Sequence, residues 1–235
     1  MFYNLAGLLN AAMVLLSLFG IAAQIRTIWR RKADPALGAP TSRLSLNQFA
    51  SSYLSYFAVF VYGYSITPFN PYLVWSRLTA LCLVLLILYE IWHDRRSRPA
   101  AAVLWIALGG LALGLLGLLC GGRLSDAGRH ISTALILANA VILAQGGIHQ
   151  IRVILQAGDA GAVNLRMNQL VLGMHLSTLL FVFAMGLGTG WPLMILALSG
   201  GSVKLVVLYL FRWIRVSETA RNRRLAAAPR ATLNP

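Results

Sequence analysis

The chain has 235 residues, of which 58% are hydrophobic and 11% are charged, a balance that excludes an ordinary soluble domain and is typical of a polytopic membrane protein. The formal charge of +14 does not indicate a nucleic-acid partner, because most basic residues lie in short segments between apolar runs, where membrane topology places them. The two cysteines, Cys82 and Cys120, match neither a metal-binding nor a disulfide spacing. We therefore expect an all-α membrane protein without a metal or another cofactor.

Three apolar runs in the first part of the chain have about the 20-residue length that a membrane-spanning helix needs. The first predicted helix covers residues 4–28 and contains Asn10. It is expected to remain in the membrane, because it lacks a basic leading segment and no cleavage site follows it. The second, at 45–66, is rich in hydroxyl and aromatic side chains, and the third, at 71–92, contains Arg77 inside its apolar run.

The rest of the chain contains four further apolar runs that predict membrane-spanning helices. They cover residues 101–121, 131–155, 167–187 and 192–213. A turn from Gly188 to Pro192 is expected between the last two. Beyond the last run the tail is basic and rich in alanine, and we expect it to be disordered after Arg224.

The predicted helix at 101–121 differs from the others because it consists almost entirely of Ala, Leu and Gly. Its glycines form two pairs with a spacing of four residues, Gly110/Gly114 and Gly117/Gly121. Such pairs are typical of a helix face that packs closely on a neighbour. We expect a linker helix that offers a contact for a homo-oligomer.

Two copies of one pattern organise the chain. Gly, Gln, Ile, Arg and Ile stand at positions 20, 24, 25, 26 and 28, and the same five residues recur at 146, 150, 151, 152 and 154. A second block follows each copy, with Asn-Gln at its end in both cases. This self-similarity predicts two three-helix units. The expected division is a first bundle at 1–93, a linker with one helix at 94–128, a second bundle at 129–214 and a basic cytoplasmic tail at 215–235.

Basic residues decide the expected orientation. Alternate loops and the tail hold nearly all of them, whereas the opposite loops hold only Arg123 and Arg129. Because cytoplasmic loops carry the excess of Lys and Arg, we expect the N-terminus outside and the C-terminus in the cytoplasm. One linker helix between two three-helix units then makes the units parallel in the membrane. The high Ala, Leu and Arg content favours a GC-rich bacterial genome, and hence a bacterial inner membrane.

These features resemble the PQ-loop superfamily and, within it, the SWEET-like transporters. The resemblance rests on a Gln at the cytoplasmic end of the first helix of each unit, on the basic loop after it, and on seven helices arranged as three, one and three. It covers about residues 1–214. It implies two parallel three-helix bundles around a central pathway for a sugar, an amino acid or a related small solute.

The repeated polar residues are the predicted gate and hinge. The family's Pro-Gln pairs stand here as Ala23-Gln24 and His149-Gln150. In lipid the amides must find partners, so they either bond to each other and to helix ends or form an inner gate, and both roles are compatible. Nearby glycines can supply the pliability of the missing prolines. The predicted gate and hinge residues are Gln24, Gln150, Gly20, Gly146, Asn47, Gln48, Asn168 and Gln169.

Two basic residues inside apolar runs are the strongest candidates for solute contacts. Lys204 lies near the middle of its predicted helix, where a charge costs about 2.5 to 3.5 kcal/mol on insertion scales. It either contacts an anionic or carbonyl-rich solute, packs among carbonyls and hydroxyls of the protein, or reaches toward headgroups. Arg77 either clamps a carboxylate or phosphate or extends to the outer interface. The predicted substrate-binding residues are Lys204, Arg77, Ser76, Asn10, Asn139, Tyr53, Tyr56 and His175.

The expected function is transport, not catalysis. No Asp or Glu lies deep in a predicted helix, since Glu90 stands near a helix end, so a carboxylate proton relay is not indicated. We predict a transporter of a small polar solute (a sugar, an amino acid or a small anionic metabolite) that works by alternating access and facilitated diffusion. The alternatives are a ligand or cargo receptor on the same fold, and a partner subunit without transport. Apart from the solute, the lipid bilayer is the expected partner.

Overall fold

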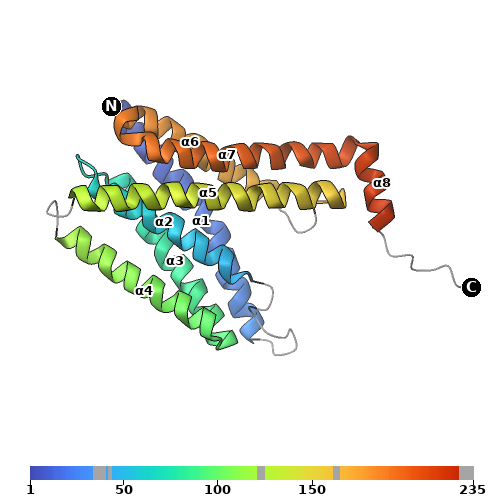
Figure 1. Cartoon of the computed structure of the whole chain (residues 1–235), viewed down its shortest axis with the longest axis horizontal. Helices are drawn as coiled ribbons and strands as arrows, with labels where there is room; N and C mark the ends of the chain where they lie inside the picture. Colours follow the sequence, from blue (N-terminus) through green and yellow to red (C-terminus); the bar gives the residue numbers. More distant parts are fainter. Residues whose placement is uncertain (34–40, 42–43, 121–124, 161–164, 228–235) are drawn as a thin grey trace, which may run out of the picture.

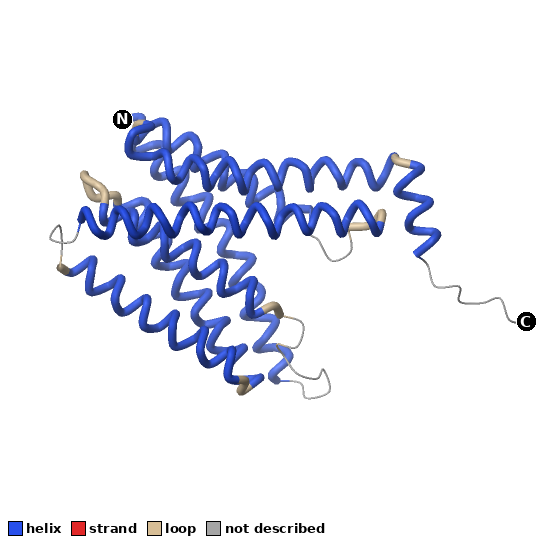
Figure 2. The backbone as a smooth tube through the Cα atoms, in the orientation of Figure 1, coloured by secondary structure: helices blue, strands red, loops and turns tan. Residues whose placement is uncertain are grey.

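The computed structural model of the chain describes residues 1–33, 41, 44–120, 125–160 and 165–227, and the regular structure within these ranges is entirely α-helical (Figures 1 and 2). Its helices are α1 (Phe2–Ala33), α2 (Leu46–Ser65), α3 (Pro71–Arg95), α4 (Arg98–Leu119), α5 (Ser125–Ala157), α6 (Leu165–Met185), α7 (Leu187–Val216) and α8 (Glu218–Ala227). The first seven follow the predicted order.

By length and composition, six of these helices are able to cross a membrane, namely α1, α3, α4, α5, α6 and α7. The sequence predicted seven. The remaining helix, α2, has 20 residues, but Gln48 and its many serines and tyrosines lower its mean hydropathy. A chain with six such helices in its described part has the character of an integral membrane protein.

The boundary between α6 and α7 differs from the predicted turn at 188–192. The chain reverses at Gly186, whose φ of 86° suits glycine, and α7 begins immediately afterwards at Leu187. The carbonyl of Gly186 accepts a hydrogen bond from the amide of Thr189, at 3.2 Å. Pro192 therefore lies inside α7, where its missing N–H costs one backbone bond near the helix start. The prediction that α7 begins at Pro192 was wrong.

The tail forms an additional helix, α8, where the sequence predicted disorder after Arg224. The Ser217 hydroxyl oxygen accepts a hydrogen bond from a first-turn amide of α8 at 3.4 Å, which is the usual role of a helix-capping serine. Arg223 of α8 donates to the carbonyl of Leu155 on α5. The predicted disorder is thus wrong as far as Ala227, because this helix is fixed to the end of α5.

Helix packing divides the chain into two groups of three. In the first group α3 packs against both α1 and α2, and in the second group α7 packs against both α5 and α6. The groups meet through two pairs, α1 with α6 and α2 with α5. The pattern of close contacts is therefore unchanged when the groups are exchanged. Helix α4 lies on the outside of the first group, against α2 and α3 (Figure 1).

The two groups are joined at one end and diverge toward the other (Figure 1). We call the end at which α1 begins the N-terminal end, and the end at which α1, α3, α5 and α7 finish the basic end. One buried cluster near the N-terminal end, the shared core, draws residues from all six helices. Its members are Ala6, Ala58, Val59, Tyr62, Ile66, Leu73, Ile136, Phe181, Val182 and Leu193.

Toward the basic end, each group has a hydrophobic cluster of its own. The buried members in the first group come from α1, α3 and α4, and are Ile25, Ile28, Ile87, Ile91 and Ala100. Those in the second group come from α5 and α7, and are Ile154, Val207, Leu210 and Ile214. Since buried apolar area is the main source of cohesion, the described residues join the groups at the N-terminal end and leave them separate at the basic end.

Large apolar side chains cover the outward faces of the helices. Phe19 of α1 and both Ile106 and Leu113 of α4 are 70% exposed or more. Continuous apolar surface of this kind is unfavourable in water, but in a bilayer it contacts acyl chains. These faces therefore support the membrane assignment independently of helix length.

Two glycines of α4, Gly114 and Gly117, face the interior of the first group. A Cβ atom at Gly114 would lie 2.9 Å from the ring of Phe57, and one at Gly117 would lie 2.7 Å from the hydroxyl oxygen of Tyr64. Both glycines therefore let α4 approach the aromatic residues of α2 closely, while Gly121 lies outside the described residues. A homo-oligomer contact through α4 would have to use its opposite, leucine-rich face.

Candidate functional site

Asn10 connects α1 to both α3 and α6, one turn along α1 from the shared core. Its buried side-chain amide donates to Ser177 Oγ at 3.2 Å and to Thr178 Oγ1 at 2.8 Å. Its oxygen accepts a hydrogen bond from Arg77 Nη1 at 3.4 Å. Because polar groups in an apolar interior need partners, these bonds hold the two groups together below the shared core. We call this set the Asn10 bridge.

A second asparagine makes the corresponding connection between α5 and α2. Asn139 is fully buried, and its amide donates to the hydroxyl of Ser55. Its Oδ1 atom has no hydrogen-bond partner among the described residues. In both bridges, an asparagine on the first helix of one group donates to a hydroxyl on the second helix of the other. We call the contact between Asn139 and Ser55 the Asn139 bridge. It has one hydrogen bond where the Asn10 bridge has three, and is thus the weaker member of a nearly symmetric pair.

The hydroxyl residues of these bridges were not among the predicted site residues. The hydroxyls of Ser177 and Thr178 both donate to the carbonyl of Met174, at 2.8 Å each. This leaves their oxygens free to accept from Asn10. A signal was present in the sequence, because a buried asparagine donor needs an acceptor and hydroxyls inside apolar runs are the natural ones.

Arg77 is buried on α3, with 5% of its surface exposed. Its Nη1 atom donates to Ser76 Oγ at 2.9 Å as well as to Asn10. No carboxylate of the described residues pairs with it, and the ion pair that they do contain joins Lys32 to Glu90. Because its side chain is buried and bonds to Asn10, the alternative in which Arg77 extends to the outer interface is wrong. A buried cation held only by neutral groups is costly, which marks this position for a further partner.

His175 and Lys204 lie on neighbouring helices of the second group. The ring of buried His175 packs on Gly200 of α7, where a Cβ atom would come within 2.4 Å of the ring. Lys204 follows Gly200 by one turn on the same face, is half-buried, and makes no hydrogen bond or ion pair with the described residues. His175 lies within electrostatic range of both Lys204 and Arg77. Basic side chains from α3, α6 and α7 thus border one interior region.

The two predicted tyrosines occupy different surroundings. The hydroxyl of Tyr53 donates to the carbonyl of Ala107 on α4 at 2.6 Å, so Tyr53 faces the linker helix. Tyr56 is half-buried and lies within electrostatic range of Arg77. The structure therefore brings Tyr56, but not Tyr53, to the region around Arg77.

The predicted hinge residues lie beyond the bridges, toward the basic end. Gln24 and Gln150 are half-buried on α1 and α5, two helices that are not among the closely packed pairs of the described chain. A Cβ atom at Gly20 or Gly146 would meet no atom within 4 Å. The two copies of the repeat are therefore not in close contact in this structure.

The asparagine-glutamine pairs of the second repeat block begin α2 and α6. Asn47, Gln48 and Gln169 are exposed, whereas Asn168 is buried. The two pairs therefore differ in burial despite their matching sequence. Their predicted role in a gate stays a prediction.

Two carboxylates fasten the basic end of the first group. Glu90 accepts hydrogen bonds from Trp29 Nε1 at 3.0 Å and from the ammonium group of Lys32. Asp94 accepts bonds from the amide and hydroxyl of Thr41, at 3.0 and 2.5 Å. These contacts, the basic-end clamp, tie the end of α1 and Thr41 to α3.

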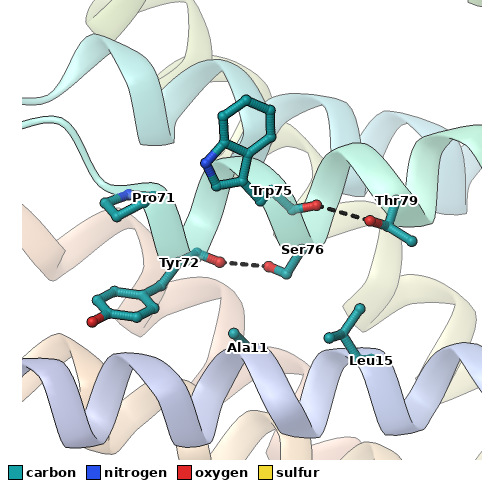
Figure 3. Close-up of a pocket in the computed structure, with 7 residues that line it drawn as sticks. All are labelled: Ala11, Leu15, Pro71, Tyr72, Trp75, Ser76 and Thr79. Carbon is teal, nitrogen blue, oxygen red and sulfur yellow. Dashed lines mark hydrogen bonds between the residues drawn. The ribbon is translucent and has the colours of Figure 1, made fainter.

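A hollow of about 300 Å³ opens between α1 and α3 on the outside of the first group (Figure 3). Its walls are mostly apolar, and Trp75 is 56% exposed. The hydroxyl of Ser76 donates to the carbonyl of Tyr72 at 2.6 Å, and that of Thr79 to the carbonyl of Trp75 at 3.0 Å. Because α3 itself satisfies these hydroxyls, the hollow suits a lipid chain better than a polar solute.

The candidate site is therefore the region bordered by Arg77, the Asn10 bridge, His175 and Lys204, which we call the polar interior. Comparison of the chain with family models, with curated proteins and with solved structures finds no match. The assignment of this site rests on the contacts described above.

Proposed function

We propose that the chain is a membrane transporter that moves a small polar solute by alternating access. The observation that carries this proposal is the arrangement of the two groups, which are closed together at the N-terminal end and separate at the basic end. The polar interior lies directly below the closed end. A transporter that is open to one side and closed to the other needs this arrangement.

The proposed architecture consists of two three-helix bundles joined by α4. It is supported by the contact pattern, in which each group packs in the same way and the two groups meet symmetrically. On this view α2 is a seventh spanning helix, which tolerates its hydroxyl groups because α3, α4 and α5 surround it. This arrangement is the one that the resemblance to SWEET-like members of the PQ-loop superfamily implies.

The proposed orientation places the basic end in the cytoplasm, in a bacterial inner membrane. The structure then corresponds to a state open to the inside. In the opposite state, the shared core and both bridges would separate, and the repeated segments around Gln24 and Gln150 would approach each other. Because no carboxylate of the described residues pairs with a basic residue of the polar interior, we propose facilitated diffusion along the solute gradient.

Crosslinking of the closed end tests alternating access. The hydroxyl of Tyr62 on α2 donates to the carbonyl of Thr189 on α7, so these positions face each other between the groups. In a background with Cys82→Ser and Cys120→Ser, a short thiol crosslinker applied to Tyr62→Cys/Thr189→Cys should abolish solute uptake into liposomes. Cleavage of the linker should restore uptake.

The control is Thr189→Cys alone, which the reagent should modify without loss of uptake. Full uptake by the crosslinked double variant would contradict alternating access. Saturable binding without uptake by any variant, including the unmodified chain, would instead identify the receptor or partner-subunit alternative.

A further inference from the structure

The hydrogen bonds of Arg77 leave one edge of its side chain free. Both of its bonds to described residues, to Asn10 and Ser76, come from Nη1. A guanidinium group carries five N–H donors, and those on Nε and Nη2 meet no described acceptor. The Nε/Nη2 edge presents two parallel donors, which is the geometry that binds a carboxylate with two hydrogen bonds.

The charge around this edge is positive and uncompensated. The cations Arg77 and Lys204 approach the polar interior from α3 and α7, and no ion pair of the described residues involves either of them. The buried ring of His175 on α6 lies within electrostatic range of both. Asn10, Ser177 and Thr178 add only neutral groups. An uncompensated cation in a membrane interior is expensive, and an anion that enters with the solute would remove this cost.

We infer that the solute is a small organic anion whose carboxylate binds the Nε/Nη2 edge of Arg77. The inference rests on the proposed transport function. Of the three predicted solute classes (a sugar, an amino acid and a small anionic metabolite), it selects the third. A sugar offers no charge to Arg77. The ammonium group of a zwitterionic amino acid would be repelled by Lys204. A hydroxy acid fits best, because its hydroxyl can donate to the remaining lone pair of Asn10 Oδ1, whereas the donors of the Asn10 bridge are already used.

Binding to the unmodified full-length protein is the first test. The probes are carboxylates of two to six carbons, including hydroxy and keto acids, each paired with its uncharged amide, together with glucose and alanine. Titration calorimetry in a neutral detergent should show saturable binding of at least one carboxylate and none of its amide. The inference is overturned if no carboxylate binds, or if an amide, glucose or alanine binds as tightly as the best acid.

Substitution at Arg77 is the second test. Arg77→Gln should weaken binding of the best acid by about 30-fold or more, since it removes one partner of a buried charged pair. Arg77→Lys keeps the charge but loses the two-donor edge, and should fall between Arg77→Gln and the unmodified protein. Arg98→Gln makes the same change at an exposed position of α4 and should have no effect.

Equal affinity of Arg77→Gln and the unmodified protein would overturn the inference. If Arg77→Gln does not fold, the comparison of acids with amides on the unmodified protein still tests the inference. A lipid headgroup could supply the same anionic chemistry. Stabilisation by phosphatidylglycerol vesicles that depends on Arg77, without binding of soluble acids, would therefore also overturn it.

Uptake by liposomes separates this inference from the proposed function. Acid binding that depends on Arg77, but without uptake, would contradict transport and leave the binding site intact. Uptake of a neutral solute that does not depend on Arg77 would support transport and contradict the inference that the solute is an organic anion.

Discussion

The two groups of helices pack alike but are fastened differently at their basic ends. In the first group, the basic-end clamp ties α1 to α3 through Glu90, and Asp94 of α3 holds Thr41. The second group relies on aliphatic contacts between α5 and α7, and on the bond from Arg223 of α8 to Leu155. The difference indicates that the repeated sequence determines how the helices pack. Individual polar residues determine which hydrogen bonds fasten the basic end of each group.

A second difference lies within the repeat itself. Gly147 follows Gly146 in the second copy, where the first copy has Ile21 after Gly20. A Cβ atom at Gly147 would lie 2.4 Å from a methyl group of Val203, so this glycine lets α5 approach α7 closely. Ile21 instead contributes its side chain to the hydrophobic clusters of the first group.

The largest effect is expected when the second group receives the residue of the first. Gly147→Ile places a branched side chain where even a Cβ atom meets Val203, and overpacking of this kind costs about 1 to 3 kcal/mol or more. Unfolding in mixed micelles of increasing SDS content measures the loss. Gly146→Ile is the control, because its side chain would point into open space. Equal losses for the two variants would contradict the close contact of α5 with α7.

A smaller effect is expected when the clamp is weakened. Glu90→Gln removes the charge that Lys32 and Trp29 contact, and a hydrogen bond to a charged group contributes about 1.5 to 3 kcal/mol. The lower part of this range applies, since the Lys32 side chain is 34% exposed and can reach water. Glu218→Gln, at an exposed position of α8, should change the melting temperature little. A melting temperature unchanged by Glu90→Gln would mean that the clamp does not stabilise the first group.

The smallest effect is the difference expected between the two bridges, which tests their inequality. Hydrogen bonds between helices in a membrane contribute about 0.6 kcal/mol on average. Asn10→Ala removes three such bonds, whereas Asn139→Ala removes one and also eliminates an unpaired oxygen. Asn10→Ala should therefore lower the unfolding free energy more than Asn139→Ala in the same SDS titration. The reverse order would show that the Asn139 bridge is the principal connection between the groups.

Much of the helix order could be predicted from the sequence, because apolar runs of membrane length have few alternative structures. The start of α7 could not, since Pro192 has the character of a first helical residue and only the chain reversal at Gly186 shows otherwise. Helix α8 was missed for a similar reason. Its polar, alanine-rich sequence resembles a disordered tail, and Arg223 fixes it through a contact 68 residues away in the chain.

The candidate site was predictable in its residue types and less so in its membership. Arg77, Asn10 and His175 stood out because polar groups inside apolar runs are costly, and the structure brings them together. Tyr53 was included as an aromatic residue that could line the pathway, but its hydroxyl donates to the carbonyl of Ala107 on α4. Which face of α2 points inward depends on its neighbours, and that information is not local to the helix.

The modest hydropathy of α2 bears on how the chain enters the membrane. A helix with this many hydroxyl groups gains little from contact with lipid alone. Its favourable surroundings are its neighbours, above all α3, which approaches so closely at Gly63 that a Cβ atom there would lie 2.8 Å from Leu73. In the proposed seven-helix architecture, insertion of α2 is therefore coupled to that of α3, and the two would enter the bilayer together as a hairpin.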